Sequence, residues 1–511
     1  MKRAIVVIGL QMFAIGSAFA GSESPTPLKL SLTDCLTIAL KADSNIRLLR
    51  LTALDEALDV DAEVGRFFPT VSASVLGFVD RNFPVRAQNG TILDRHRRSL
   101  TYGAGIQGLT PIGLTYGVEL SSGINWNSAD SFTRYGASLE VVLRQPLLRG
   151  AGIAANLYRL RVAKLGAHQT EQALQVRRKD LFLRVVAAYW GLFSRREELK
   201  ISKKSLELAE EQLKATEKRV RLGNLSPLDL VEARAAIAVR KQERVRAAQA
   251  VLDAERALLL LLYRRTAHGE TIDLRRRIIP GDTLRPVDER RSLHTLIAIA
   301  DTNRPELNEL RVRVQRAELQ KEGSENSTLP SLSFDVGFGS WSEPVDFYGL
   351  LGDVNRDQSG AWGDLLTFRR PYLRFGLTFS LPLSARAREV TFQRSVVGVR
   401  RARESLAARH ASLAVEVRDA YFQLRDAGER VAAARVREKL AEQNLDAMEK
   451  KFRGGISTSF DVLRSQVDLA NAGKDLAQAL TQQAVLHAEL EASIGRLAAH
   501  LGMPHGKMLT P

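Results

Sequence analysis

A long stretch without proline, Leu147 to Ser226, dominates the hydrophobic pattern of the chain. Apolar side chains recur there at every seventh position, and a small side chain follows most of them three positions later. The large residues are Val185, Leu192, Leu199, Leu206, Leu213 and Val220, and the small ones are Ala188, Ser202, Ala209 and Thr216. This a/d pattern, which Arg195 interrupts once, is typical of closely packed coiled-coil helices. It predicts a helix from about Gly152 to Arg221, on the order of 100 Å long at ~1.5 Å per residue.

A turn and a returning helix follow this stretch. After the turn at 222–227, a second Ala- and Leu-rich segment without proline runs from Leu228 to about Leu262. The pattern therefore predicts a very long antiparallel helical hairpin, because a short turn brings two such helices back alongside each other.

The hairpin occurs twice, and the offset is 232 residues (461 − 229 = 232). This offset places Gly223 on Gly455 and Asp229 on Asp461. The hydrophobic seam is repeated as well, and Glu438 is the one polar residue that interrupts it. A repeat of this length indicates two copies of one structural unit and excludes a solenoid of short period.

A shorter helical pattern precedes each hairpin. It runs from Ser31 to about Gly65, with Ser31 or Thr33 as the N-cap, and it ends before Pro69. A second copy lies 261 residues later (330 − 69 = 261), and the segment Asn303-Arg304-Pro305 interrupts or starts the helix there.

Strand-like segments with strict apolar and polar alternation follow these helices. Each half of the chain thus reads helix, strand, loop, strand and long helical hairpin. The first half has a strand after Pro69, an extra alternating pair around Thr101–Gln107 and Leu114–Ser121, and a last strand near Ala137–Arg144. The second half has a strand after Pro330, a loop over 340–370 and a strand over 373–381.

The alternation suits an outer-membrane β-barrel with its apolar face toward lipid, although a small soluble sheet covered by helices has the same pattern. Strands in lipid must close on themselves, because an open edge leaves backbone groups without hydrogen bonds. About four membrane strands per chain cannot close a barrel with a usable lumen. A membrane barrel would therefore be shared among subunits.

The formal net charge of the chain is +16. Cleavage of the N-terminal segment would remove Lys2 and Arg3 and lower the net charge to +14 (16 − 2 = 14). The positive residues alternate with Glu and Asp along the helices, which favours solvated helix faces over a nucleic-acid-binding tract. Lys2-Arg3, the apolar run from Ala4 to Ile15 and the sequence Ala18-Phe19-Ala20 predict a cleaved secretory signal. No later run approaches the ~20 apolar residues of a membrane helix.

The single cysteine, Cys35, excludes an intrachain disulfide. Leu32-Thr33-Asp34 before it do not suit a lipid-attachment site, so we expect a small apolar residue on the inner face of a helix. The sequence carries no His-Glu-x-x-His, paired cysteines, phosphate loop or serine flanked by an evident base and acid, and its eight histidines are scattered singly. We therefore expect no enzyme activity, no catalytic residue, no cofactor and no metal site.

The duplicated plan resembles the TolC-type outer-membrane efflux proteins over residues from about 30 to 497. The motifs that carry the resemblance are Ala-Leu near 39–40, Pro-x-Val/Leu after the first helix, Gln145-Pro146-Leu147, and Gly-x-x-Ser/Thr-x-x-Asp at both hairpin tips. The expected domains are a signal peptide at 1–20, a first repeat at 21–262, a linker or equatorial segment at 263–290, a second repeat at 291–497 and a mobile tail at 498–511.

The resemblance implies a mainly α fold with membrane β-strands. Three protomers would each give four strands to a 12-stranded β-barrel, continuous with a trimeric α-helical barrel that crosses the periplasm. A periplasmic adaptor and an inner-membrane transporter would dock at the far end, for drug efflux, metal efflux or type I protein secretion. The alternatives are a secreted soluble coiled-coil structural or adhesion protein and a nucleic-acid-binding coiled coil, which the signal peptide disfavours.

The hairpin tips are the candidate adaptor-docking residues. They are Gly223, Asn224, Leu225 and Ser226 in the first repeat and Gly455, Ile456, Ser457 and Thr458 in the second. Glycine tolerates the positive φ that such helix ends require, and Ser226 or Pro227, and Ser457 or Ser459, can start the returning helices. The alternative is a purely structural turn between two helices.

The candidate residues of the periplasmic aperture are Asp229, Asp461 and Arg464. In the family, acidic residues here line or latch the closed aperture, whereas a carboxylate in the first turn of a helix also has a purely structural use. This chain departs from the best-studied members, because Phe452 and Ser457 replace the Tyr and Arg that tether the closed state. Arg464 also replaces an acidic residue, so we do not carry over the closure mechanism or a cation preference.

Overall fold

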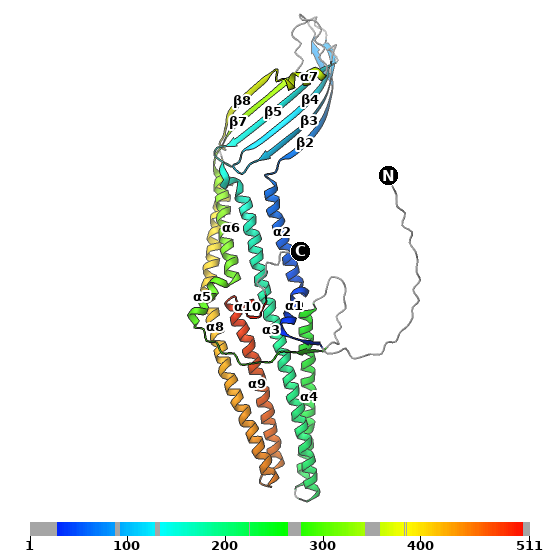
Figure 1. Cartoon of the computed structure of the whole chain (residues 1–511), viewed down its shortest axis with the longest axis vertical. Coiled ribbons are helices and arrows are strands. Elements are labelled where there is room, and N and C mark those ends of the chain that lie inside the picture. The colour runs from blue at the N-terminus through cyan, green and yellow to red at the C-terminus, as the bar shows by residue number, and fades with distance from the viewer. Residues whose placement is uncertain are drawn as a thin grey trace, which may run out of the picture. The chain divides into compact units, whose positions relative to one another are not determined.

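The computed structural model describes residues 28–86, 92–127, 133–223, 225–263, 277–342, 358–382, 384 and 386–503 (Figure 1). The predicted signal peptide lies outside these residues. The chain forms two compact units. The described parts of Met1–Ala42, Val185–Arg285 and Val431–Thr481 make the first, here called the helical unit, and those of Asp43–Arg184, Pro286–Arg430 and Gln482–Pro511 make the second, here called the sheet unit. Each unit draws residues from both predicted repeats.

The four long helices agree closely with the sequence pattern. They are α3 (Gly152–Arg221), α4 (Pro227–Leu262), α8 (Arg386–Arg453) and α9 (Ser459–Ser493). In the helical unit most of the seam residues named for α3 are buried, and Ala188, Leu199, Leu213 and Val220 are partly buried. Leu206 and Ala209 of α3 pack against Ile237 of α4 and Leu463 of α9. The close approach of these helices follows from the small side chain at the d position.

The predicted single helix over 31–65 is wrong, because the structure has two helices, α1 (Leu32–Ala42) and α2 (Ser44–Gly65). The carboxylate of Asp43 accepts hydrogen bonds from the backbone N–H groups of Asn45 and Ile46 at 2.8 and 3.0 Å, which starts a new helix. Ser31 is the residue that caps α1, since its hydroxyl accepts a hydrogen bond from the Asp34 N–H at 3.2 Å.

The second repeat has the same break. Its two helices are α5 (Leu293–Asn303) and α6 (Pro305–Thr328), separated by Arg304, which lies 261 residues after Asp43 (304 − 43 = 261). Pro305 occupies the first position of α6, where its missing N–H costs nothing. The core of the sheet unit is built on these helices and on α8 and α9, with Leu296, Leu307, Val417, Leu424, Leu490 and Ile494 buried together.

The described residues of the sheet unit form an antiparallel sheet of six strands, in the order β2-β3-β4-β5-β7-β8. The strands are β2 (Thr70–Arg86), β3 (Ile92–Leu109), β4 (Thr115–Asn127), β5 (Arg134–Pro146), β7 (Ser331–Ser342) and β8 (Pro371–Ser380). The expectation of about four membrane strands per chain is corrected here, because this sheet has six strands among the described residues. The extra pair, β3 and β4, links β2 to β5 by continuous antiparallel pairing, with one register shift at Arg81/Phe83, so it is part of the same sheet.

The loop expected over 340–370 is only partly a loop. Strand β7 continues to Ser342, and a helix, α7 (Gln358–Leu366), precedes β8; residues 343–357 lie outside the described part. Ala361 and Leu365 of α7 are buried against Ala137 of β5. The helix was not predicted because only three-dimensional contact with the sheet reveals its apolar face.

The described part of the linker predicted at 263–290 makes specific contacts, and up to Arg285 it belongs to the helical unit. Strand β6 (Ile278–Pro280) pairs in parallel with β1 (Leu28–Leu30). The carboxylate of Asp282 then accepts hydrogen bonds from the Leu32 N–H at 2.7 Å and the Tyr189 hydroxyl at 2.8 Å. Cys35 is buried, as predicted, and burial raises the pKa of its thiol to about 12.

The ordered chain continues beyond the predicted start of the tail at residue 498. A short helix, α10 (Leu497–His500), follows α9, and Leu497 and Met503 are buried. The Gly495 φ of +76° allows the turn between α9 and α10. Residues 504–511 lie outside the described part.

Candidate functional site

The two faces of the six-stranded sheet differ in chemistry. Large apolar side chains project from one face without cover, and the most exposed are Val71 (77%), Phe375 (73%), Val75 (71%), Leu373 (66%) and Leu377 (66%). Such a continuous exposed apolar surface marks contact with a lipid or another protein. No helix of the described residues is both long and apolar enough to cross a membrane.

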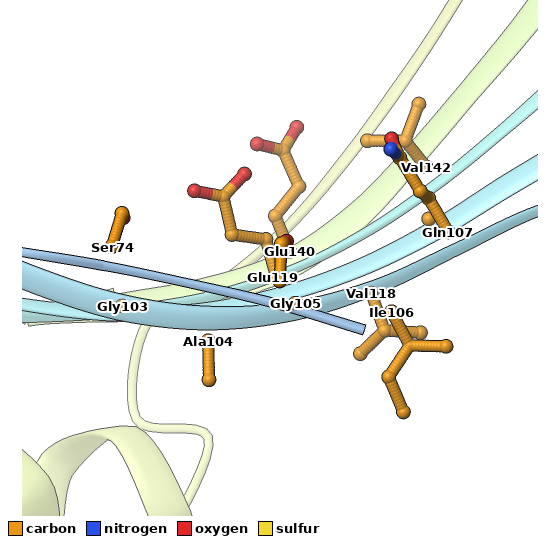
Figure 2. A pocket seen from close by; sticks show the side chains of 12 residues that line it. Ser74, Gly103, Ala104, Gly105, Ile106, Gln107, Val118, Glu119, Glu140 and Val142 are labelled. Atoms are coloured by element: carbon orange, nitrogen blue, oxygen red, sulfur yellow. The ribbon is translucent and has the colours of Figure 1, made fainter. Parts of the chain in front are cut away.

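The opposite face is polar and lined with glycine. Figure 2 shows Ser74, Glu119 and Glu140 on this side of the strands and Ala104, Ile106 and Val118 on the other, around a pocket of about 180 Å³. Glu119 and Glu140 are paired in register across β4 and β5. Both signs of charge are present, because Arg374 donates to Glu140 at 2.7 Å and Arg144 forms an ion pair with Asp335. Toward the edge, Leu76 and Phe78 of β2 are apolar exceptions on this face.

The helical unit ends in two tight turns, and each contains a predicted glycine. Gly223 has a φ of +74° and Gly455 a φ of +76°, as expected. At the second tip the N–H of Ile456 bonds to the Lys451 carbonyl at 2.9 Å and the N–H of Gly455 bonds to the Phe452 carbonyl at 3.0 Å. This is the Schellman arrangement, which satisfies the last carbonyls of α8. Asn224 lies outside the described residues.

Asp229 and Asp461 form caps on the returning helices. Asp229 accepts from the Ser226 N–H at 3.0 Å, and Ser226 is the N-cap with Pro227 at the first helical position. Asp461 accepts from the N–H and hydroxyl of Thr458 at 3.0 and 2.7 Å. The hydroxyl of Thr458 in turn accepts from the Asp461 N–H, so Thr458 caps α9, and Ser459 starts the helix as predicted.

The hydrogen bonds from Thr458 and Ser457 hold the pKa of Asp461 below its usual range. The carboxylate therefore stays ionised while it caps the helix. Both aspartates thus have the structural role expected of acidic residues at a helix N-terminus. A role at the aperture remains a prediction.

Arg219 joins the two hairpin tips within the helical unit. Its guanidinium donates to the carbonyls of Phe452 at 2.7 Å and Arg453 at 3.3 Å, and it lies over the Phe452 ring with its central carbon 4.0 Å from the ring centroid. This contact was not predictable from the sequence pattern, because the two partners are 233 residues apart. The basic residues in the last turn of α3 were the only available signal.

A buried polar contact lies close to the same tips. The side chains of Gln212 and Thr216 on α3 meet the hydroxyl of Ser459 at 3.3 and 3.2 Å. Thr216 and Ser459 are fully buried. Because a buried hydroxyl is costly without a partner, these bonds fix the position of α9 against α3.

The tip residues present apolar side chains to solvent. Leu225 packs beside Phe452 and Val462, whereas Ile456 is 79% exposed. The other exposed apolar residues near the tips are Leu222, Leu228 and Phe460. Four uncovered apolar side chains at two adjacent turns favour a binding surface over a simple solvated turn.

Comparison with known proteins decides the family. A family model described as outer membrane efflux protein matches residues 113–262 and 296–496, which is more than half of the chain. The chain belongs to the outer membrane efflux protein family. It is an efflux channel of the outer membrane, and its resemblance to TolC-type proteins is confirmed.

Solved structures have the same fold as this efflux channel. The CmeC outer-membrane channel of Campylobacter jejuni aligns over 91% of this chain and 86% of its own, with a TM-score of 0.62 and 14% identity. VceC of Vibrio cholerae aligns over 91% and 96%, with a TM-score of 0.61 and 15% identity. The open-state MtrE channel of Neisseria gonorrhoeae aligns over 91% and 89%, with a TM-score of 0.59 and 15% identity. A search of curated protein sequences finds no match.

Proposed function

We propose that the efflux channel is a homotrimer whose sheets close one β-barrel in the outer membrane. The observation that carries this proposal is the sheet with two free edges. Among the described residues β2 pairs only with β3 and β8 only with β7, so the outer edge of each has no partner, although the sheet has a lipid-compatible apolar face. Open edges leave N–H and C=O groups unsatisfied in lipid, so the edges need partners from other chains.

The strand directions support closure between copies. Five successive antiparallel pairings separate β2 from β8, so these two edge strands run in opposite directions. The β8 edge of one copy can therefore pair with the β2 edge of the next without breaking the antiparallel alternation. Three copies would contain 18 strands (3 × 6 = 18) instead of the 12 expected from the resemblance. Since barrel diameter increases with strand number, this channel would have a wider lumen than a 12-stranded barrel.

The trimer is tested by its mass in detergent. We expect light scattering, after subtraction of the bound detergent, to give the mass of three chains, because a single six-stranded sheet cannot satisfy its own edges in a membrane. A stable monomer that remains with the outer membrane would contradict the shared barrel. A chain that a high-salt wash removes from the membrane would likewise contradict the shared barrel.

The hairpin tips are the proposed docking site for a periplasmic adaptor, which would connect the channel to an inner-membrane transporter. The exposed side chains of Leu222, Leu228, Ile456 and Phe460 support this role. Apolar side chains at the centre of an interface supply most of its binding energy. The proposed docking residues are Gly223, Asn224, Leu225, Ser226, Gly455, Ile456, Ser457 and Thr458.

Arg464 is proposed to lower the cation preference of the periplasmic aperture. It is exposed, lies one helical turn after Asp461, and makes no ion pair within the described residues. In a trimer, each of these two charges would occur three times around one axis. A narrow, low-dielectric constriction screens charges poorly, so a ring of arginines would offset the ring of aspartates.

Reversal potentials across a planar bilayer in a salt gradient test this proposal. We expect Arg464→Asp to shift the channel toward cations by several-fold in permeability ratio. Arg244→Asp on α4 is the matched control, because Arg244 is exposed but distant in sequence from both tips. An unchanged ratio in Arg464→Asp would show that Arg464 faces away from the aperture.

A further inference from the structure

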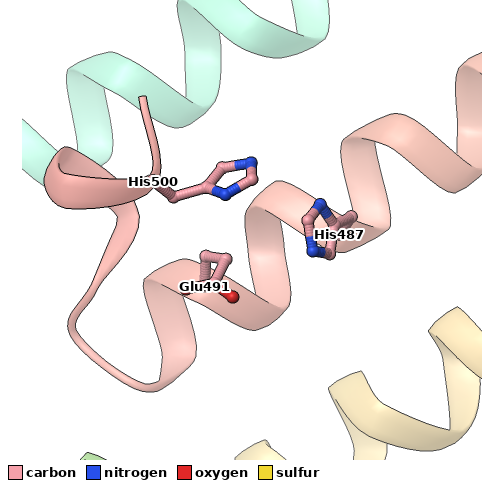
Figure 3. Close-up of side chains that lie close together, drawn as sticks. All are labelled: His487, Glu491 and His500. Atoms are coloured by element: carbon pink, nitrogen blue, oxygen red, sulfur yellow. The ribbon is translucent and has the colours of Figure 1, made fainter. Parts of the chain in front are cut away.

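Three side chains of the sheet unit lie together at the end of α9, apart from the tips and from the polar face of the sheet. Figure 3 shows His487 and Glu491 on α9 and His500 on α10 turned toward one another. One ligand atom from each of the three lies within 4.8 Å of the others. No sequence pattern connects the two histidines, because His500 lies in the segment predicted as a mobile tail.

The backbone holds this cluster in place. His487 and Glu491 are four residues apart on one helix, so their side chains share a face. The N–H groups of Gly495 and Arg496 bond to the carbonyls of Ala492 and Glu491 at 3.1 and 2.8 Å, which closes α9 with a Schellman turn. A Cβ on Gly495 would lie 2.6 Å from the Asn303 carbonyl oxygen, so this tight turn accepts only glycine. The turn brings His500 back to His487, with ring centroids 4.6 Å apart.

The charges around the cluster suit a cation. Glu491 is almost fully buried, and one of its oxygens is held by Arg291, which also bonds to Glu289 at 2.6 Å. Arg291 thus orients the Glu491 carboxylate, and its other oxygen accepts no hydrogen bond from the described residues. Glu289, Glu491 and Arg291 together carry a formal charge of −1 beside the two imidazoles.

The imidazoles are available as ligands. Burial lowers the pKa of His487, and the nearby His500 lowers it further. A neutral imidazole carries a free lone pair on one ring nitrogen, through which it can bind a metal. Two imidazole nitrogens and one carboxylate oxygen are a ligand set that Zn²⁺ and neighbouring divalent metals accept, with water in the remaining position.

We propose that His487, Glu491 and His500 bind one divalent transition metal of the Zn²⁺ type per chain. Tetrahedral coordination requires N and O ligands at about 2.0–2.2 Å from the metal, so the three side chains would close by small rotamer changes around it. The bound metal would fasten α10 to α9, while Arg291 would act as the outer partner that orients the Glu491 ligand.

Metal content of the purified full-length channel tests the proposal. The untagged protein in detergent is stripped with EDTA, incubated with ZnSO₄, freed of unbound metal by gel filtration and measured by mass spectrometry of the element. We expect one zinc per chain and a rise in the unfolding temperature of the sheet unit with added ZnSO₄. His500→Ala is expected to lose both effects, because His500 is an exposed residue whose removal leaves the core intact.

His168→Ala is the matched control, since His168 is an exposed histidine on α3 outside the cluster. It is expected to bind zinc like the parent chain. His487→Ala and Glu491→Gln extend the test to the other two ligands, with circular dichroism to check the fold. Zinc retained at one per chain in His500→Ala, or less than a tenth of an equivalent in the parent, would overturn the proposal.

Discussion

Gly455→Pro is expected to abolish efflux while the channel still reaches the outer membrane and assembles. The φ of Gly455 is +76°, and proline is confined to a φ near −65°. Proline also removes the N–H that bonds to the Phe452 carbonyl at 3.0 Å. Both effects break the Schellman turn, so the proposed docking surface around Ile456 would lose its shape. Gly223→Pro should act in the same way at the first tip, where φ is +74°.

Gly455→Asn is the matched control for this prediction. Asparagine tolerates a positive φ better than other residues with a side chain, and a Cβ at position 455 meets no heavy atom within 4 Å. We expect Gly455→Asn to retain most of the efflux. The measurement is growth of a strain that depends on this channel in the presence of an exported compound, with membrane fractionation and detergent mass for each variant. Efflux that persists in both proline variants would show that the tips are not the docking site.

Arg219→Ala is expected to raise the conductance of the resting channel several-fold. We propose that Arg219 holds the aperture closed in this chain. Phe452 and Ser457 stand here where the best-studied relatives have the Tyr and Arg that tether the closed state. Hydrogen bonds from a charged donor contribute about 1.5–3 kcal/mol. Arg219 is partly buried. A loss of about 2 kcal/mol, after discounting for its remaining exposure, would change the ratio of closed to open tips roughly 30-fold. The stacking on Phe452 adds to this effect.

Arg221→Ala and Arg219→Lys separate the tether from charge. Arg221 lies two residues further in the same last turn, is exposed, and bonds only to the Glu217 carbonyl of its own helix among the described residues. Its removal is expected to leave the conductance unchanged. Arg219→Lys keeps the charge but loses the planar fork that reaches two carbonyls, so we expect partial opening. Equal conductance in Arg219→Ala and the parent, measured in planar bilayers, would show that the contact does not tether the aperture.

The residue patterns predicted the elements of this channel with high accuracy wherever the signal is local. The heptad seam gave the bounds of α3, because burying one face of a helix imposes a period that can be counted along the chain. The alternation after Pro69 and Pro330 located β2 and β7 for the same reason. The positive φ at Gly223 and Gly455 was also predictable, since the chain must reverse within a few residues.

The positions where helices break and where further helices or strands occur were harder to predict from the sequence. Asp43 divides the first helix through two side-chain hydrogen bonds, yet an aspartate inside a helical pattern often lies on a solvated face. Helix α7 was missed because it is short and its apolar side chains are buried only against the sheet. The extra pair β3 and β4 was detected, but alternation alone does not tell whether two more strands join a membrane sheet or lie outside it.

The sequence by itself determined the duplicated plan, the long hairpins, the polar and apolar faces of the strands, and through them the family. These features depend on periods and motifs that span only a few neighbouring residues at a time. Only the tertiary structure decided that six strands form one sheet, that Arg219 reaches the carbonyl of Phe452, and that His500 returns to His487. The physical reason is that such contacts depend on how distant segments pack, and a periodicity along the chain carries no information about which distant side chains will meet.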